Sequence, residues 1–241
     1  MTLSVHVLGT RSPYPVAESP CSGYLVNTSD TFVLLDLGLA VWPELLRRVD
    51  PSRLSAIWIS HLHPDHSADL LAAYQWAANT NGSRPIPVYG PAGWAERLGA
   101  FLPIPDGPAQ VRRLFDVHEH TGDPVLFGGL TLTAVAVHHS VPTWGFRLTC
   151  NGMSLAYSAD TGPCAALDAL ADDADLLICE AGSAQPGTEY HCSPEEAAHA
   201  GRLARRLVLT HLAPGLPPAD ASHRAGGAGI AVPGMHLDVR S

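Results

Sequence analysis

Four side chains that can bind a metal ion fall within six residues, in the segment His61-Leu62-His63-Pro64-Asp65-His66. Neutral imidazole nitrogens and carboxylate oxygens are good ligands for zinc and similar divalent metals, which bind few ligands at short distance. The segment follows the apolar run Ile57-Trp58-Ile59, so a buried strand would present it. Because successive side chains of a tight turn point in different directions, this one segment can serve two neighbouring metal ions.

Three more candidate ligands also follow apolar runs that are typical of strands: His139, Asp160 and His211. Rigid elements that end at a common crevice can hold such side chains close together. A single histidine in such a place is usually structural, but four strand ends that finish in His or Asp form a much rarer pattern. The sequence therefore predicts one metal centre built from distant parts of the chain.

The composition limits the partners that such a centre could serve. The 241 residues are 46% hydrophobic and 15% charged, which is enough apolar material for a sizeable core. A formal net charge of -9 disfavours nucleic acid or an anionic membrane as a partner, because both need a basic face. A small anionic substrate remains compatible, since metal ions can reverse the sign of the field inside a pocket.

The five cysteines are scattered and form no CxxC pair: Cys21, Cys150, Cys164, Cys179 and Cys192. This pattern is typical of reduced thiols in a cytoplasmic protein. No basic-then-apolar leader precedes the strand-like residues 5–8, and no apolar run approaches the length of a membrane span. We therefore expect a cytoplasmic protein without a membrane partner.

Hydrophobic periodicity predicts the elements that must position the candidate ligands. The expected strands cover residues 3–8, 23–26, 31–35, 54–59, 86–89, 125–127, 130–137, 146–150, 153–157, 175–179 and 207–209. The expected helices cover residues 43–48, 69–78, 93–100 and 194–206, and the last has a serine N-cap, proline at N1 and glutamate at N3. Hairpins followed by strand–helix alternation predict an α+β domain with helices outside two sheets.

Five motifs carry a family resemblance: His61-x-His63-x-Asp65-His66, His139-x-Val141-Pro142-x-x-Gly145-Phe146-Arg147, Tyr157-Ser158-Ala159-Asp160-Thr161-Gly162, Cys179-Glu180-Ala181 and Leu209-Thr210-His211-Leu212. With these motifs the chain resembles the metallo-β-lactamase superfamily over most of its length. Within it the chain is similar to the short-form ribonuclease-Z-like hydrolases. The resemblance implies a four-layer αββα sandwich and a single domain over residues 1–241.

The resemblance also implies a ligand set for two divalent metal ions. His61, His63 and His139 would hold metal 1; Asp65, His66 and His211 would hold metal 2; Asp160 would bridge both. Zinc is the first expectation, with manganese or iron as alternatives, because His/Asp sites select only modestly among these metals. The two metals would activate a bridging hydroxide as nucleophile, which Asp65 would help to orient.

Glu180 and His191 are the expected proton-transfer pair. In the ribonuclease-Z-like group a glutamate and a histidine in these places are thought to assist protonation of the leaving oxygen. A phosphodiester needs such help because an alkoxide is a poor leaving group. The alternative is that His191 only packs at a helix N-terminus.

Several neighbouring residues have more than one interpretation. Asp36 is expected to brace the metal-bearing loop rather than bind metal. His139 fits its motif better than His138, which strand alternation places on the opposite face. Trp144 could flank the site or pack in the core, and Arg147 could neutralise a phosphate or brace a sheet edge.

Several other residues are expected to take no part in metal binding or catalysis. His118 and His120 fall in an acidic, loop-like stretch and are expected to be solvated, and Cys192 is not expected to be catalytic. The proline- and glycine-rich tail after Leu212 departs from the expected family ending, so its packing is not predicted. Substrate selectivity is expected to lie in loops around residues 13–22, 79–85 and 102–107.

The leading functional hypothesis is a phosphodiesterase that acts on a small anionic substrate such as a cyclic nucleotide, as some similar actinobacterial members do. A second is tRNA 3′ processing, but residues 140–159 leave room only for a short hairpin where many ribonucleases Z carry a tRNA-gripping arm. A third is a lactonase, β-lactamase or thioesterase of a biosynthetic pathway, and a fourth is a non-enzymatic metal-binding scaffold. A homodimer is expected by family analogy alone.

Overall fold

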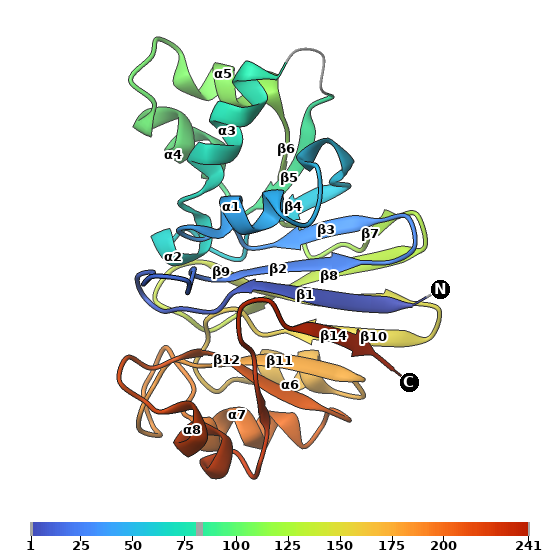
Figure 1. The fold of residues 1–241 in the computed structure, drawn as a ribbon, viewed down its shortest axis with the longest axis vertical. Coiled ribbons are helices and arrows are strands. Elements are labelled where there is room, and N and C mark those ends of the chain that lie inside the picture. The colour runs from blue at the N-terminus through green and yellow to red at the C-terminus, as the bar shows by residue number, and fades with distance from the viewer. Residues whose placement is uncertain (1, 81–83, 241) are drawn as a thin grey trace.

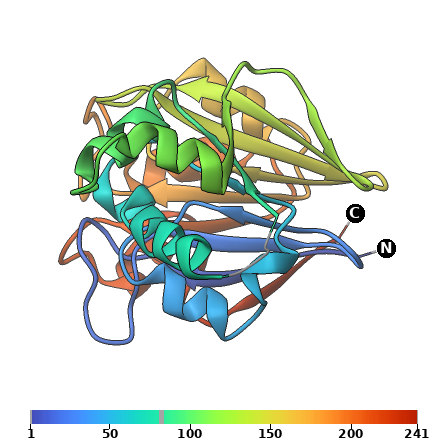
Figure 2. The ribbon, with the colours of Figure 1, turned by 90° about the horizontal axis from the view of Figure 1, so that it is seen from above.

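Two seven-stranded sheets lie face to face between two layers of helices (Figure 1). The computed structural model describes residues 2–80 and 84–240. The predicted α+β, four-layer αββα arrangement is confirmed, and Figure 2 shows the layers from above.

The first sheet has the strand order β14-β1-β2-β3-β4-β5-β6. Its strands are β1 (Leu3–Gly9), β2 (Gly23–Asn27), β3 (Phe32–Leu35), β4 (Ala56–Trp58), β5 (Ile86–Gly90), β6 (Phe115–Glu119) and β14 (His236–Val239). Its helices are α1 (Val41–Leu46), the 3₁₀ turn η1 (Pro51–Arg53), α2 (Pro64–Ser67), α3 (Leu70–Asn79), α4 (Trp94–Phe101) and α5 (Gly107–Leu114).

The second sheet has the order β13-β12-β11-β10-β9-β8-β7. Its strands are β7 (Val125–Phe127), β8 (Leu130–Val137), β9 (Thr143–Cys150), β10 (Met153–Tyr157), β11 (Leu176–Ala181), β12 (Leu207–Leu212) and β13 (Gly229–Ile230). Its helices are α6 (Ala165–Ala171), α7 (Pro194–Gly201) and α8 (Pro218–Arg224).

The two sheets repeat one topology. Strands β1–β3 and β7–β10 are antiparallel meanders, whereas β3–β6 and β10–β13 are parallel. Within a parallel set all carboxyl ends meet at one edge of the sheet, and this is where open α/β sheets bind ligands. The candidate ligands follow β4, β8 and β10 or lie at the end of β12. Strand β8 is antiparallel to β9, as β10 is, so it runs in the same direction as β10 and its end meets the same edge of the sandwich.

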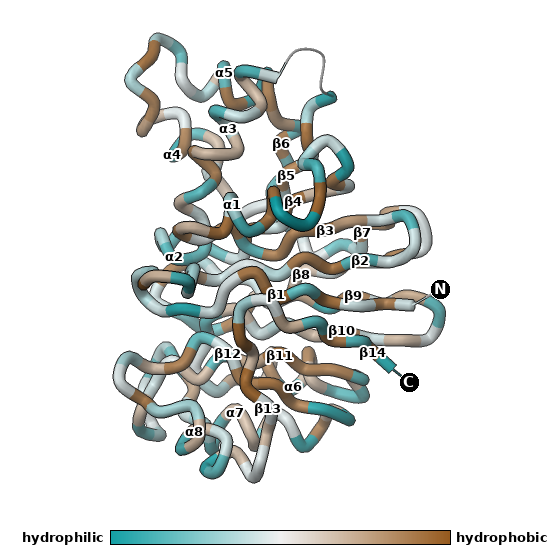
Figure 3. Tube along the Cα trace, viewed as in Figure 1, coloured by the Kyte–Doolittle hydropathy of each residue, from teal (hydrophilic) through white to brown (hydrophobic). Residues whose placement is uncertain are grey.

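Three apolar cores hold the layers together. The central core lies between the sheets and contains Tyr24, Trp58, Phe146 and Tyr157, each at most 1% exposed. A second core packs helices α1, α3, α4 and α5 on the first sheet, and a third packs α6, α7 and α8 on the second. The hydropathy colouring of Figure 3 follows this pattern, with hydrophobic segments concentrated in the strands.

The structure differs from the predicted elements at a few places. Helices α5 and α6 and strand β6 were not predicted, and the helix expected over residues 194–206 ends at Gly201, which packs on Leu207. The tail forms α8, β13 and β14, and β14 pairs with β1 to complete the first sheet. Residues 81–83 of the loop around 79–85 lie outside the described residues.

His120 is partly buried among aromatic side chains, so the expectation that it is solvated was wrong. Its ring lies 5.1 Å from the ring of Trp58 and 5.5 Å from that of Trp144. Its Nε2 lies 2.9 Å from the carbonyl oxygen of Ile59. Burial lowers the pKa of His120 to about 4. The acidic neighbours in sequence point to solvent, whereas the pairing of β6 with β5 turns this end of the chain toward the sheets.

We expect His120 to make the stability of the protein depend on pH. A histidine of pKa about 6.5 in the unfolded chain and about 4 in the folded one binds more protons when unfolded, so its contribution is complete above pH 6.5 and is lost as the pH falls toward 4. The change is roughly 3 kcal/mol across this window. In His120→Gln, denaturant titrations should give a correspondingly smaller change in unfolding free energy between pH 6.5 and 4.

The exposed histidine His223 supplies the control for this measurement. His223→Gln should leave the pH dependence of the parent protein in place. If His120→Gln and the parent lost the same free energy over this range, the burial argument for His120 would be wrong.

Among residues 2–80 and 84–240, no helix is both long enough and apolar enough to cross a membrane.

Candidate metal centre

The segment after β4 and the short helix that follows it direct the clustered ligands toward one point. His61 and His63 extend from the end of β4, and Pro64 then begins the short helix α2, whose first turn carries Asp65 and His66. Gly38 lies against this turn, and a Cβ on it would come within 2.0 Å of the Asp65 carbonyl oxygen. The sequence therefore needs glycine at position 38 for the loop after β3 to approach the ligand-bearing turn.

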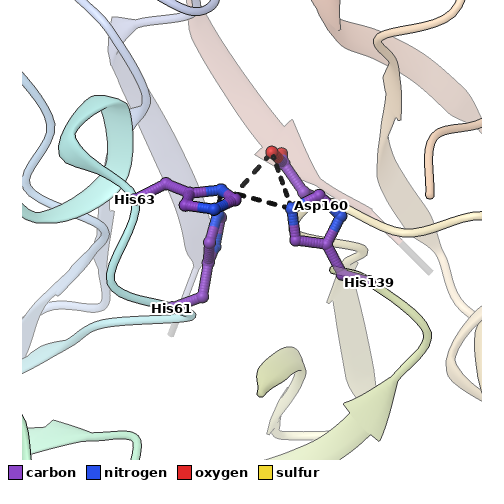
Figure 4. Close-up of side chains that lie close together, drawn as sticks. All are labelled: His61, His63, His139 and Asp160. Atoms are coloured by element: carbon purple, nitrogen blue, oxygen red, sulfur yellow. Dashed lines mark hydrogen bonds and ion pairs between the residues drawn. The ribbon is translucent and has the colours of Figure 1, made fainter. Parts of the chain in front are cut away.

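The first group of candidate ligands consists of three histidines and an aspartate: His61, His63, His139 and Asp160. Figure 4 shows their three rings and the carboxylate turned toward one another. His63 Nδ1 lies 3.1 Å from His61 Nε2 and 3.3 Å from His139 Nε2. Asp160 Oδ2 lies 3.7 Å from His61 Nε2 and 3.9 Å from His139 Nε2.

The second group shares Asp160 with the first and adds Asp65, His66 and His211. Asp160 Oδ1 lies 3.1 Å from His66 Nε2 and 3.3 Å from His211 Nε2. Asp65 Oδ2 lies 3.2 Å from His211 Nε2 and 3.8 Å from His66 Nε2. The two oxygens of Asp160 therefore face different groups, as a bridging carboxylate would.

The donor sets of both groups fit a divalent cation. Ligands about 2.0–2.1 Å from a tetrahedral metal lie about 3.3 Å from one another, close to the separations found here. Asp160 Oδ1 is buried and has no hydrogen-bond partner within residues 2–80 and 84–240, which is costly unless another group satisfies it. The residues present can thus hold two metal ions, one in each group.

Each group takes two residues from each sheet of the sandwich. His61, His63, Asp65 and His66 follow β4 of the first sheet, whereas His139, Asp160 and His211 belong to the second. The distance between the two sheets therefore sets the ligand geometry of both groups. Neither sheet alone supplies a complete set.

Hydrogen bonds on the outer ring nitrogens fix the orientation of three histidines. His66 Nδ1 lies 2.7 Å from Asp36 Oδ2, and His139 Nδ1 lies 2.9 Å from the Tyr190 carbonyl oxygen. His61 Nδ1 lies 3.0 Å from Ser60 Oγ, which itself donates to Asp36 Oδ2. When each Nδ1 donates, the Nε2 lone pair is left free to face the metal position.

Asp36 is the buried centre of these contacts. Its carboxylate is fully buried and accepts hydrogen bonds from Ser60 N at 2.7 Å, Ser60 Oγ at 2.9 Å and Tyr157 OH at 2.7 Å. It also contacts His66 and belongs to neither ligand group, which agrees with its expected bracing role. Sequence reasoning gave no role to Ser60, Tyr157 or the Tyr190 carbonyl. Two local signals existed: Ser60 directly precedes His61, and Tyr157 begins the motif that contains Asp160.

Backbone strain accompanies the site. Asp36, Ala159 and His211 adopt positive φ angles of 58°, 51° and 48°. Non-glycine residues rarely adopt this conformation, and it tends to occur at functional sites. His211 lies inside β12 at a register shift in its pairing with β11, rather than after the strand as predicted.

Electrostatics favour neutral rings in the first group and an ionised Asp160. Burial lowers the pKa of His61, His63 and His139, which keeps these rings in the neutral form that binds metal. Burial raises the pKa of Asp160, but the charges of nearby histidines outweigh it and hold that pKa well below its usual range. Burial alone would lower the pKa of His66, but the negative charges of Asp160 and Asp36 outweigh this effect and raise that pKa. The pocket around His66 therefore favours bound positive charge.

Glu180 and His191 form a pair beside both groups. His191 Nδ1 lies 2.9 Å from Glu180 Oε1, and the His191 ring lies 5.0 Å from that of His139 and 5.7 Å from that of His211. Glu180 is 1% exposed, whereas the His191 side chain is 32% exposed. Glu180 also accepts hydrogen bonds from the backbone N–H groups of Thr161 and Gly182.

The surroundings of Glu180 and His191 raise the pKa of both groups, which favours a proton on the pair. Burial raises the pKa of Glu180. Burial alone would lower the pKa of His191, but the hydrogen bond and the charge of Glu180 raise it above its usual value. A Cβ on Gly182 would come within 2.7 Å of His191 Nδ1, so glycine at this position allows the ring to approach the carboxylate.

The structure distinguishes between the alternative interpretations of Arg147, Trp144 and His138. Arg147 Nη1 donates to the Leu170 and Asp172 carbonyl oxygens at the end of α6, so it braces helix and sheet. Trp144 packs with His120 against the central core. His138 is exposed and belongs to neither group.

Cys192 is fully buried, and a hydrogen bond with Cys179 together with burial raises its thiol pKa, so it is a poor nucleophile.

Comparison with known proteins agrees with this geometry. A family model described as a beta-lactamase superfamily domain matches residues 24–212. An uncharacterized protein of Mycobacterium leprae is 37% identical over 226 residues, covering 89% of this chain and 79% of the relative. A ribonuclease Z of Mycobacterium sp. (strain KMS) is 33% identical over 257 residues, covering 92% of this chain and 89% of the relative.

A solved structure has the same fold throughout. The metallo-beta-lactamase fold protein YhfI of Bacillus subtilis superposes with a TM-score of 0.85 at 27% identity, covering 98% of this chain and 99% of that one. The chain thus belongs to the beta-lactamase superfamily. It is a metal-dependent hydrolase with a metallo-β-lactamase fold.

Proposed function

We propose that the protein is a binuclear phosphodiesterase that acts on a small anionic substrate such as a cyclic nucleotide. Zinc is the first choice for both ions, with manganese or iron as alternatives. The observation that carries the proposal is the Glu180–His191 pair, which lies beside both ligand groups with its imidazole partly open to solvent. Cleavage of a phosphodiester releases an alkoxide, so a proton donor in this place has a clear task.

When bound, the two ions would supply a water of lowered pKa and polarise the phosphoryl oxygens. The protein's own groups divide the remaining work. Asp65, whose Oδ2 lies 3.2 Å from His211 Nε2, can also accept a hydrogen bond that orients the attacking oxygen. Glu180 holds His191 by Nδ1, which leaves Nε2 of that ring free to protonate the leaving oxygen.

A small substrate suits the charge and shape of the chain better than a polynucleotide. The chain carries a formal charge of -9, which opposes extended contact with a phosphate backbone. Bound cations would make the centre locally positive and so attract one or two phosphates. An apolar cavity of about 670 Å³ lies beside Leu62 and Pro64 and is bounded by α3 and α4. None of the candidate ligands lines it, so this cavity is not part of the metal site.

The proposal is tested with purified protein loaded with zinc or with manganese. We expect hydrolysis of 2′,3′- or 3′,5′-cyclic nucleotides or of bis(p-nitrophenyl) phosphate, and much slower turnover of lactones, β-lactams and thioesters. His63→Ala should remove a ligand from the first group only, so at most one ion should stay bound, and turnover should be abolished. Turnover of a lactone or thioester without any phosphodiester activity would instead favour a carbon-centred hydrolase.

A second candidate function is tRNA 3′ processing, which the similarity to a ribonuclease Z favours. Against it, β9 and β10 are joined by the two residues Asn151 and Gly152, so this hairpin carries no extended arm. Cleavage of a tRNA precursor, with an affinity that falls steeply with salt, would support this candidate.

A further inference from the structure

Two fully buried tyrosines each form a hydrogen bond that joins one sheet to the other. Tyr24 lies on β2 of the first sheet, and its hydroxyl is hydrogen-bonded at 2.5 Å to Thr210 Oγ1 on β12 of the second sheet. Tyr157 lies on β10 of the second sheet, and its hydroxyl donates at 2.7 Å to Asp36, which follows β3 of the first sheet. The two rings are in contact, with centroids 4.9 Å apart.

Each of these hydrogen bonds ends next to candidate metal ligands. Asp36 contacts His66 directly and reaches His61 through Ser60. Thr210 directly precedes His211 in the strained end of β12. One tyrosine from each sheet is therefore connected to the ligands that the opposite sheet contributes.

We propose that Tyr24 and Tyr157 are positioning residues that clamp the two sheets at the separation that the metal centre requires. Both ligand groups take two residues from each sheet, so a shift of one sheet relative to the other distorts both at once. A metal site tolerates errors of only about 0.2 Å in its ligand distances. Apolar packing between the sheets is not directional, whereas two crossed hydrogen bonds fix both separation and slide.

The clamp rests on the proposed two-metal centre and adds to it a prediction about metal affinity. Tyr157→Phe and Tyr24→Phe keep the buried rings and remove only the hydroxyl groups. Losing a direct partner of a metal ligand usually costs about 10- to 100-fold in metal affinity, and each hydroxyl acts through one intervening residue, Thr210 or Asp36. We therefore expect each variant to weaken the binding of zinc by about tenfold, the lower end of this range. Thr210→Val removes the partner of Tyr24 with little change of shape and should reproduce the loss seen in Tyr24→Phe.

The experiment combines zinc titration with the visible absorption spectrum of the Co²⁺-loaded protein, which reports ligand geometry without reference to turnover. The spectrum should change in Tyr24→Phe and Tyr157→Phe. Tyr74→Phe is the matched control: Tyr74 is 7% exposed in the core between the first sheet and its helices and touches none of these groups, so affinity and spectrum should stay at the parent values.

The outcomes separate the clamp from the two-metal centre. If the parent binds two ions and both clamp variants keep its affinity and spectrum, the clamp is overturned while the proposed function stands. An equal loss in Tyr74→Phe would also overturn it, because general packing would then explain the effect. If the parent itself binds fewer than two ions, the proposed function fails first.

Discussion

Asp160→Asn is expected to reduce the metal content from two ions per chain to at most one and to reduce hydrolysis by ~10⁴-fold or more. Of the residues that the structure describes, only Asp160 belongs to both ligand groups of four, and it presents a different oxygen to each. Asparagine keeps the shape but lacks the negative charge and offers only one oxygen. Both cation positions would therefore lose a ligand at the same time, and the water of lowered pKa would be lost with them.

Metal analysis after dialysis, followed by turnover with added zinc, measures this prediction. Asp175→Asn is the control, because Asp175 is also buried but accepts hydrogen bonds from Ser154 and pairs with Arg205 at the start of β11. That variant should lose stability without losing metal. A fully active Asp160→Asn protein with two bound ions would rule out a bridging role.

The clustering of the candidate metal ligands could be predicted from the sequence because its signals are local. His61, His63, Asp65 and His66 fall in one short segment, and the remaining candidates end strands with clear apolar patterns. Strands that run in the same direction then bring such ends to one edge, whether they pair directly, as β10, β11 and β12 do, or lie two strands apart, as β8 and β10 do. Glu180 and His191 could be inferred only through resemblance, since nothing in their separate segments indicates that they meet.

The contacts that orient the ligands could not be predicted, because they join residues far apart in the chain. Tyr157 and Asp36 are 121 residues apart, and Tyr24 and Thr210 are 186 residues apart. From the sequence, a tyrosine within an apolar strand is predicted only to be an ordinary core residue. His120 was misjudged for a related reason: its neighbours in sequence are acidic, but the aromatic rings around it come from other strands.

The repeat in topology adds a physical reason for the site's position. Each sheet changes from antiparallel to parallel pairing at its central strand, β3 or β10. The carboxyl ends next to these changes, after β3, β4 and β10, carry Asp36, the clustered histidines and Asp160. Two similar halves packed face to face therefore place two similar ligand-bearing edges against each other, and a two-ion centre is the chemistry this arrangement suits.

His191→Gln is expected to reduce turnover of substrates with poor leaving groups by about 10²- to 10⁴-fold, the usual contribution of a general acid. A cyclic nucleotide must expel an alkoxide, which needs a proton as the bond to phosphorus breaks. For bis(p-nitrophenyl) phosphate we expect a loss below about tenfold, because p-nitrophenolate leaves readily without one. His191, Glu180 and His211 also lie close enough to form a third set of possible ligands, but His191 Nδ1 is bonded to Glu180 and His191 is absent from the two groups that share Asp160. We therefore expect the metal content of those two groups to be unchanged.

The comparison between the two substrates tells a proton donor from a residue that only shapes the site. If His191 mainly held the substrate or supported His139, His191→Gln would slow both substrates by the same factor. His138→Gln is the control, because His138 is a nearby exposed histidine outside the Glu180 pair and should leave both rates unchanged. Glu180→Gln should resemble His191→Gln in its leaving-group dependence, since the Glu180 carboxylate holds the imidazole by Nδ1.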